Sequence, residues 1–365
     1  MSSMWKSRLC LSIFGQSHGE AIGMTLDGLP AGLEIDMESL HSFLLRRAPG
    51  QSNLSTSRKE EDMPKFISGI VKGKTCGAPI TALIYNRNAR PSDYSEIKDI
   101  PRPSHADYSA HVKYGGFHDY SGGGHFSGRL TAALCIAGSI CKQILEKRGI
   151  IIAAHINSIG IVNDIPFSPM NLTSEQLKAF SEMSFPSFSK DQAAAMQEEI
   201  VKARQEQDSI GGTIRCIAMG LPPGLGDPMF DGMENRIAQL AFAIPAVKGI
   251  DFGAGFESAA MRGSEHNDPF FLDGETVKTK SNNHGGILGG ITSAMPLVFR
   301  IAIKPTPSIG KEQESVHFRL NKPAVLKVQG RHDPCIVPRA VPCVEAVAAI
   351  AIYDAILSYE GAKYI

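Results

Sequence analysis

The densest group of chemically reactive side chains lies in the stretch 101–149. It holds four histidines and two arginines, namely His105, His111, His118, His125, Arg102 and Arg129. The triple glycine Gly122–Gly124 lies in its middle, and an apolar run with helix period begins at Leu130. Glycine lets a ligand approach the main chain closely, and the free N–H groups at a helix N-terminus attract anions. The stretch therefore predicts an anion-binding site.

Two histidines have the surroundings expected of a general acid or base. His18 lies in Gly15-Gln-Ser-His-Gly and His105 in Arg102-Pro-Ser-His, both in predicted loops and not on apolar helix faces. A histidine with its ordinary pKa of about 6.5 can deliver a proton at neutral pH. The wide spacing of the four central histidines, without a carboxylate or thiolate at a suitable offset, does not match a zinc or iron site. We therefore predict proton transfer and no metal.

The glycine-rich stretches do not match the common nucleotide-binding motifs. No Gly-Lys-Ser or Gly-Lys-Thr follows Gly122–Gly124, and no G-x-G-x-x-G follows a predicted strand. Gly73-Lys-Thr75 resembles the end of a Walker loop but lacks the upstream glycine, so we interpret it as a hairpin turn. Any one glycine run is explained by an ordinary tight turn, but several runs beside His or Arg favour a phosphate-binding nest.

Arginines offer a way to recognise a substrate with several anionic groups. The candidates are Arg47, Arg58, Arg102, Arg129 and Arg331. The planar guanidinium fork binds carboxylate and phosphate through two hydrogen bonds, although any single arginine is more often a surface or salt-bridge residue. Because the chain carries 37 Lys and Arg against 37 Asp and Glu, anion recognition must be local.

Composition places the chain among cytosolic globular proteins. The 365 residues are 43% hydrophobic and 20% charged, which is ample for a core. Seven scattered cysteines without a C-x-x-C pair indicate reduced thiols. Charged residues interrupt the apolar C-terminal helix after Pro342, so we expect it to be buried and not to span a membrane. We predict a cytoplasmic protein with neither nucleic-acid nor membrane partners.

Hydrophobic periodicity predicts a mixture of helices and strands. Strands are expected at 9–14, 23–26, 66–71, 80–85, 150–156, 213–219, 297–303 and 324–328. Helices are expected at 36–47, from 130 to about 148, from 173, 189–206, 231–243 and from 342. The polar segment 51–64 is interpreted as a mobile surface loop. Because there is no linker or repeat, we predict one α+β domain over residues 1–365.

Several motifs together resemble the chorismate synthase family. They are Phe14-Gly-Gln-Ser-His-Gly-Glu, Arg46-Arg-Ala-Pro-Gly-Gln-Ser, Arg102-Pro-Ser-His-Ala-Asp-Tyr, Gly122-Gly-Gly-His-Phe-Ser-Gly-Arg, Asn283-His-Gly-Gly-Ile-Leu-Gly-Gly, Lys304-Pro-Thr-Pro-Ser and Gly330-Arg-His-Asp-Pro-Cys. They occur in the family's order over essentially the whole chain. The resemblance implies a helical layer sandwiched between antiparallel β-sheets, assembled as a homotetramer.

The same resemblance implies an activity. It is the 1,4-anti elimination of phosphate from 5-enolpyruvylshikimate 3-phosphate, which gives chorismate in the shikimate pathway of aromatic amino-acid biosynthesis. The family's lyase needs reduced FMN although the reaction has no net redox change. By resemblance, His18 lies near the leaving phosphate, His105 is associated with protonating the flavin, and Asp333 acts with the flavin as a base.

The binding residues are carried over in the same way. The implied substrate-binding residues are Arg47, Arg58, Arg102, Arg129 and Arg331. The implied cofactor-binding residues are His125, Phe126, Ser127, Ala246, Gly289, Lys304, Pro305, Thr306, Pro307, Ser308 and Arg331.

The chain departs from the common family pattern at a few positions. His125 and Phe126 stand where many members have Arg and Ser, Ala48 and Asn53 replace arginines, and Pro245 replaces a common asparagine. Because these changes remove positive charge, we hypothesise that the chain does not reduce flavin with NADPH and needs an external reductant. Two alternatives stay open, a flavin-binding phosphosugar lyase with another substrate and a non-catalytic flavin- or anion-binding protein.

Overall fold

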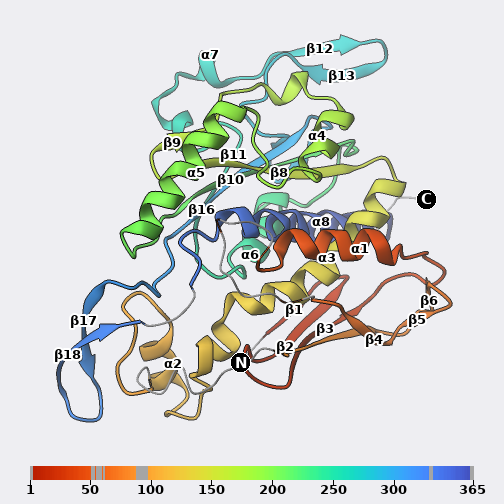
Figure 1. Ribbon diagram of the computed structural model, residues 1–365. Helices are drawn as coiled ribbons and strands as arrows, with labels where there is room; N and C mark the ends of the chain where they lie inside the picture. Colours follow the sequence, from red (N-terminus) through yellow and green to blue (C-terminus); the bar gives the residue numbers. More distant parts are fainter. Residues whose placement is uncertain are drawn as a thin grey trace.

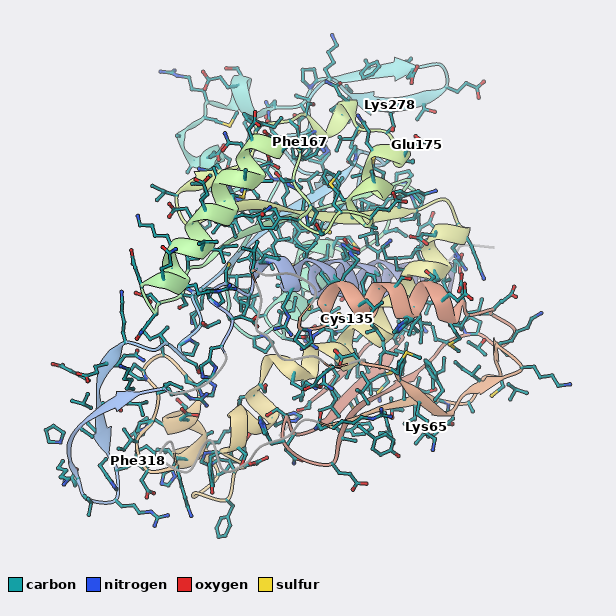
Figure 2. All side chains as sticks on the ribbon, viewed as in Figure 1. Lys65, Cys135, Phe167, Glu175, Lys278 and Phe318 are labelled. Carbon is teal, nitrogen blue, oxygen red and sulfur yellow. The ribbon has the colours of Figure 1, made fainter. Side chains whose placement is uncertain are left out.

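The computed structural model describes residues 3–50, 54, 60, 62–87, 98–328 and 332–361. Two five-stranded antiparallel sheets enclose a layer of helices, as the sequence predicted (Figure 1). One continuous hydrophobic core includes residues of both sheets and of the helices between them, which supports the expected single domain. Side chains fill the spaces on both sides of the helical layer, as Figure 2 shows.

The first sheet is formed mainly by the N-terminal part of the chain. Its strand order is β1-β2-β3-β7-β4, with bounds Met4–Lys6, Cys10–Gly15, Ala21–Asp27, Ile80–Tyr85 and Lys65–Ser68. Residues Ile80, Ala82 and Ile84 alternate with more exposed neighbours along β7, so one face of the sheet packs on the helices.

The second sheet lies on the opposite side of the helical layer. Its strand order is β11-β16-β10-β8-β9, with bounds Val247–Phe252, Leu297–Ile303, Gly212–Met219, Ile151–Ile159 and Val162–Asn163. Strand β8 is buried along nearly its whole length because helices pack on both of its faces. Helix α8 (Val337–Gly361) covers the inner face, and α4 (Ser174–Phe180) and α5 (Lys190–Gln205) cover the outer face (Figure 1).

The central layer contains α1 (Met37–Arg47), α3 (Thr131–Lys147), α6 (Met233–Ala241) and α8. Helices α3 and α8 touch at Gly138, where an added Cβ atom would lie 2.2 Å from the Cβ of Ala346. Only glycine permits this close crossing. Helix α8 is long and apolar enough to span a membrane, but 94% of its most apolar window is buried inside the protein. It is therefore the core helix that the sequence predicted.

Short helices and hairpins complete the described chain. The helical pieces are α2 (Asp107–Lys113), α7 (Gly263–His266) and the 3-10 turns Ser121–Phe126, Gly128–Leu130, Pro169–Asn171 and Gly255–Ala260. The hairpins are β5–β6 (Ile70–Val71, Lys74–Thr75), β12–β13 (Phe270–Asp273, Thr276–Thr279), β14–β15 (Ile287–Leu288, Ile291–Thr292) and β17–β18 (Glu312–His317, Lys322–Lys327). Hairpins β12–β13 and β17–β18 project from opposite ends of the molecule (Figure 1).

The predicted helix caps are confirmed. The side chains of Asp36, Thr173 and Ser189 accept hydrogen bonds from the first turns of α1, α4 and α5. The start of α8 was placed too late, because the sequence analysis took Pro342 as the first residue and the helix begins at Val337. Pro338 lies in its first turn, where a missing N–H removes no intrahelical bond.

Candidate active site

A cavity of about 860 Å³ lies where the start of α3, the start of α8 and the edge of the first sheet meet. Residues from many separated segments line it, in the ranges 3–18, 47–49, 102–106, 122–134, 239–246, 304–308 and 332–343, together with Glu60. Every motif from the sequence analysis contributes a described residue to this lining except 283–290. The fold therefore gathers nearly all the predicted chemistry at one place.

The triple glycine brings His18 and His105 to the same wall of the cavity. Gly122 has a φ of 63°, and a Cβ atom there would lie 2.0 Å from Cε1 of His18. Gly123 has a φ of 104°, and its Cβ atom would lie 3.4 Å from Nε2 of His105. The glycines are thus needed both for left-handed backbone and for room to pack two imidazole rings.

The predicted position of these glycines at the N-terminus of a helix is wrong. The 3-10 turn Gly128–Leu130 separates them from α3, and the Ser127 side chain accepts a hydrogen bond from the N–H of Arg129 at the start of that turn. The cause is the left-handed backbone of Gly122–Gly124, which cannot continue into an α-helix.

A buried carboxylate holds His105 in place. The Nδ1 atom of His105 lies 2.6 Å from Oδ1 of Asp107, and Nε and Nη2 of Arg102 each donate to the same carboxylate at 2.8 Å. Burial alone would raise the pKa of Asp107, but hydrogen bonds from Arg102 and His105 hold it well below its usual value. With Nδ1 engaged, Nε2 is the ring nitrogen that faces Gly123 at the cavity wall.

A hydroxyl group orients the ring of His18. The Oγ atom of Ser17 donates to the carbonyl of Ser121 at 3.2 Å and lies 3.1 Å from Nδ1 of His18. Because the one hydroxyl proton goes to the carbonyl, Nδ1 of His18 is the donor in this pair. A neutral His18 held this way presents Nε2 as a proton acceptor, and a protonated His18 presents it as a donor.

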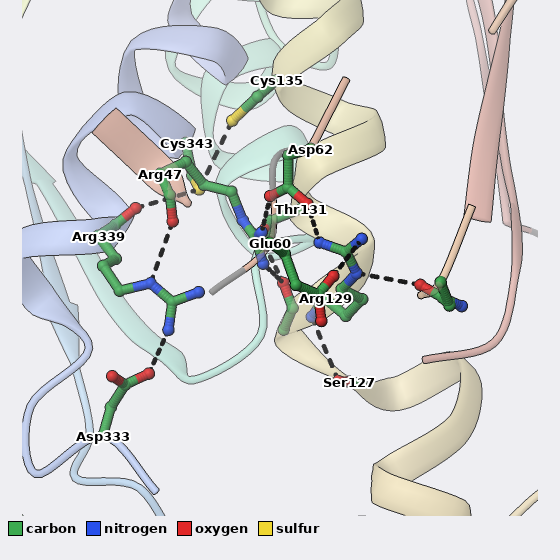
Figure 3. A network of polar contacts seen from close by, with 12 residues as sticks. Arg47, Glu60, Asp62, Ser127, Arg129, Thr131, Cys135, Asp333, Arg339 and Cys343 are labelled. Carbon is green, nitrogen blue, oxygen red and sulfur yellow. Dashed lines mark hydrogen bonds and ion pairs between the residues drawn. The ribbon is translucent and has the colours of Figure 1, made fainter. Parts of the chain in front are cut away.

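One carboxylate bridges two of the predicted substrate arginines (Figure 3). The carboxylate of Asp62 accepts from Nη1 of Arg47 at 2.8 Å and also pairs with Nη1 of Arg129. The side chain of Asp62 is fully buried. Burial would raise its pKa, but Arg47 and Arg129 lower it below the usual value. Nη2 of Arg129 also lies 2.6 Å from Oε2 of Glu60.

These contacts correct the prediction for two residues of the segment 51–64, most of which lies outside the described residues. Its described residues Glu60 and Asp62 do not lie on a surface loop, because their carboxylates pack against the cavity arginines. The composition of the segment is that of a solvated charge run, whereas Glu60 and Asp62 are paired with buried guanidinium groups.

Two further guanidinium groups have roles that the sequence analysis did not predict. Arg102 was predicted to bind substrate, and in the structure it pairs with Asp107 and donates to Oγ of Ser308 at 3.2 Å. Arg339 was missed. It lies in the first turn of α8, pairs with the Asp333 carboxylate, and donates from Nε to the carbonyl of Arg47 at 3.0 Å. Its position just after the Gly330 motif was the available signal.

Most of the predicted cofactor residues line the cavity. They are His125, Phe126, Ser127, Ala246, Lys304, Thr306, Pro307 and Ser308. Pro305 and Gly289 are not among the described residues of the lining, and Gly289 lies in the β14–β15 turn. Arg58 and Arg331 lie outside the described residues.

Two residues of the cavity lining, Lys304 and Gly128, suit a ligand that carries phosphate. The ammonium group of Lys304 lies 3.4 Å from the carbonyl of Pro305 and has no carboxylate partner among the described residues. Burial and the nearby Lys248 lower its pKa. A Cβ atom at Gly128 would meet nothing within 4 Å, so its main chain borders open space. Among the described residues, no group of three or more His, Cys, Asp or Glu side chains could hold a metal ion.

Comparison with known proteins gives a consistent result. The model of the family described as chorismate synthase matches residues 9–357. The chain is 47% identical over 356 residues to chorismate synthase from Thermococcus gammatolerans, with 97% of this chain and 98% of that protein covered. It is 44% identical over 371 residues to the enzyme of the same name from Lancefieldella parvula, with 98% and 97% covered.

The fold agrees with a solved structure. A crystal structure of chorismate synthase matches with a TM-score of 0.75 at 29% identity, covering 97% of this chain and 93% of that chain. Three observations thus indicate the same family: the sequence resemblance, the layered fold and the convergence of the motifs on one cavity. The chain belongs to the chorismate synthase family.

Proposed function

We propose that this protein eliminates phosphate from 5-enolpyruvylshikimate 3-phosphate to form chorismate, in the cavity described above. The observation that carries the proposal is that the rings of His18 and His105 pack against one glycine turn, in the same cavity as Arg47 and Arg129. The substrate carries two carboxylates and one phosphate. A cavity that combines proton-transfer groups with guanidinium groups matches this charge pattern.

We propose FMN as the cofactor, which must be reduced. A volume of about 860 Å³ is at the upper end of the roughly 300–1,000 Å³ typical of small-molecule sites, so the cavity can hold a flavin beside the substrate. Lys304 supplies a cation for the flavin phosphate, and Leu240, Ile244 and Pro245 supply an apolar surface for its ring. When bound, reduced FMN supplies transient electron density to the substrate without net oxidation.

Each of the cavity residues then has a separate role in the proposed reaction. Arg47 and Arg129 bind anionic groups of the substrate, and Asp62 keeps both guanidinium groups in place. His18 donates a proton from Nε2 to the departing phosphate, since its Nδ1 is held by Ser17. His105 holds a proton at Nε2 beside the cofactor, and the carboxylate of Asp107 stabilises the resulting imidazolium.

Asp333 is the proposed base for the hydrogen that leaves the substrate ring. Its carboxylate lines the cavity and pairs with Arg339. Its main-chain carbonyl accepts a hydrogen bond from Oγ1 of Thr306 at 3.1 Å. These contacts link the proposed base to the proposed cofactor segment and to α8.

An anaerobic assay with purified protein, chemically reduced FMN and 5-enolpyruvylshikimate 3-phosphate tests the function. We expect chorismate and inorganic phosphate in equal amounts. A phosphosugar lyase with another substrate would bind the flavin and leave this substrate intact. A non-catalytic binding protein would bind the flavin or substrate and release no phosphate from any phosphosugar offered.

We also propose a cytoplasmic homotetramer. The seven cysteines are free thiols, which supports a reducing compartment. The projecting hairpins expose apolar side chains, with Leu272 72% and Val325 64% exposed, and such surfaces are typical of subunit contacts. Light scattering after size-exclusion chromatography should give four times the chain mass. A Leu272→Asp variant that remains as large as the original protein would argue against a role of β12–β13.

A further inference from the structure

Two cysteine thiols face each other between α3 and α8 at the wall of the cavity. The Sγ atoms of Cys135 and Cys343 are 3.8 Å apart, with the Cys135 thiol donating to the Cys343 sulfur (Figure 3). Cys343 is among the residues that line the cavity, and Cys135 lies behind it with no exposed surface. The proposed elimination uses neither thiol.

The helices that carry the two cysteines lie unusually close together. Cys135 and Cys343 each lie one helical turn before the contact between Gly138 and Ala346, where an added Cβ atom on Gly138 would be 2.4 Å from the Ala346 Cα. A disulfide bond requires an S–S distance of about 2.05 Å. Rotation of two side chains on such closely packed backbones can bring the sulfur atoms to that distance.

The surroundings make the two thiols chemically unequal. A hydrogen bond from Cys135 and the positive charge of Arg47 lower the pKa of the Cys343 thiol, although burial acts in the opposite direction. Burial and the hydrogen bond to Cys343 raise the pKa of Cys135 well above its usual value. A thiol of lowered pKa at a cavity wall, beside a second thiol of raised pKa, is the arrangement of a peroxide-reactive cysteine with its resolving partner.

We propose that Cys135 and Cys343 form a modification site for hydrogen peroxide, which oxidises the pair to a disulfide that links α3 to α8. The Cys343 thiolate attacks one peroxide oxygen, the O–O bond breaks, and a sulfenic acid forms as hydroxide leaves. The Cys135 sulfur then attacks the sulfenic sulfur and loses its proton, and the sulfenic oxygen leaves as water. Overall, two thiols lose two electrons, and one peroxide is reduced to two waters.

Oxidation of this pair changes the surroundings of the cavity arginines. The Cys343 thiol donates a hydrogen bond to the carbonyl of Arg339 at 3.7 Å, a bond that the oxidised sulfur cannot make, and the Arg339 side chain in turn holds Asp333 and the carbonyl of Arg47. Moving the sulfur toward Cys135 therefore disturbs groups at the proposed site. This consequence rests on the proposed function, whereas formation of the disulfide does not.

The covalent test uses the reduced full-length protein, treated with a small molar excess of hydrogen peroxide and then alkylated under denaturing conditions. We expect loss of two alkylatable thiols and a peptide in which Cys135 is linked to Cys343. Cys135→Ser should stop at a sulfenic acid on Cys343 that reacts with dimedone, and Cys343→Ser should leave Cys135 reduced. Cys141→Ser, a buried control on α3, should form the link like the original protein.

Oxidation confined to the exposed Cys76, with both helix thiols still alkylatable, would overturn the proposal. For the consequence, we expect phosphate release to fall at least tenfold in the linked protein and to recover with dithiothreitol. A linked protein with unchanged phosphate release would overturn the connection to the cavity. A reduced protein that releases no phosphate would contradict the proposed function and leave the covalent test intact.

Discussion

Replacing Asp107 by Asn tests whether a buried carboxylate sets the proton position on His105. The carboxylate accepts from Nδ1 of His105 at 2.6 Å and from two nitrogens of Arg102 at 2.8 Å. An amide has one oxygen. If that oxygen remains with Nε and the main-chain N–H of Arg102, the NH₂ group faces Nδ1 of His105 and can only donate to it. The single ring proton is then forced onto Nε2, and because Nδ1 must accept, the imidazolium proposed to donate from Nε2 cannot form.

The size of the effect follows from these contacts. A positioned acid or base contributes about two to four powers of ten to the rate, so turnover should fall by roughly 100- to 10,000-fold. Asp107 and its partner Arg102 are both buried. Each charge-assisted hydrogen bond that the substitution removes costs about 1.5–3 kcal/mol of folding stability. We therefore expect a measurable loss of stability in addition to the loss of rate.

The assay combines turnover at saturating reduced FMN with the ¹⁵N chemical shifts of the His105 ring, which distinguish the two tautomers. Asp273→Asn is the matched control, because Asp273 also pairs with a cation but lies exposed on the β12–β13 hairpin. Near-normal turnover of Asp107→Asn, or an unchanged His105 tautomer in a folded variant, would show that Asp107 does not set the proton position on His105. An equal loss of rate in the control would point to a general effect of charge.

Three further predictions concern the glycine turn, the flavin cation and the arginine bridge. Gly122→Ala adds a methyl group 2.0 Å from the ring of His18, at a residue whose φ is 63°. We therefore expect the rate to fall at least tenfold and the folded state to lose about 1–2 kcal/mol of stability. A normal rate would be inconsistent with this packing. Lys304→Met should weaken FMN binding by roughly ten- to a hundred-fold with little change in stability, and an unchanged fluorescence titration would remove Lys304 from the cofactor site. Asp62 has a lowered pKa in the folded protein, so its contribution is present above its ordinary pKa of about 4 and is lost as the pH falls below it. Asp62→Asn should therefore reduce the stability of the folded protein at neutral pH by up to about 3–5 kcal/mol. On acidification the variant should lose less stability than the original protein. Urea-denaturation midpoints of the two proteins that fall in parallel from pH 7 to 3.5 would contradict this.

The sequence predicted secondary structure correctly where a local signal, such as a capping side chain or a hydrophobic period, identifies the element. Asp36, Thr173 and Ser189 are recognisable from the sequence because an N-cap is a short-range hydrogen bond. Strand β17 was missed because its sequence, Glu312–His317, alternates without an apolar face and it pairs only with β18. An exposed hairpin of this kind leaves little hydrophobic pattern to detect.

The site was predictable as a set of residue types but not as a set of pairs. The motifs identify His18, His105 and Arg47 as candidates, and the cavity includes all three. That Asp62 would join Arg47 to Arg129 depends on how a loop packs against two helices, which no local pattern encodes. The sequence therefore indicated Arg47 and Arg129 as substrate-binding candidates without revealing the buried carboxylate that pairs with both of them.

The test closest to the central claim measures chorismate and phosphate together under strictly anaerobic conditions. One arm contains FMN reduced chemically, and a second contains FMN with NADPH as the only reductant. We expect equal amounts of chorismate and phosphate in the first arm, with the flavin still reduced at the end, and no product in the second. The proposed function would be contradicted if folded protein binds reduced FMN but releases no phosphate from 5-enolpyruvylshikimate 3-phosphate. Formation of product with NADPH alone would contradict the need for an external reductant.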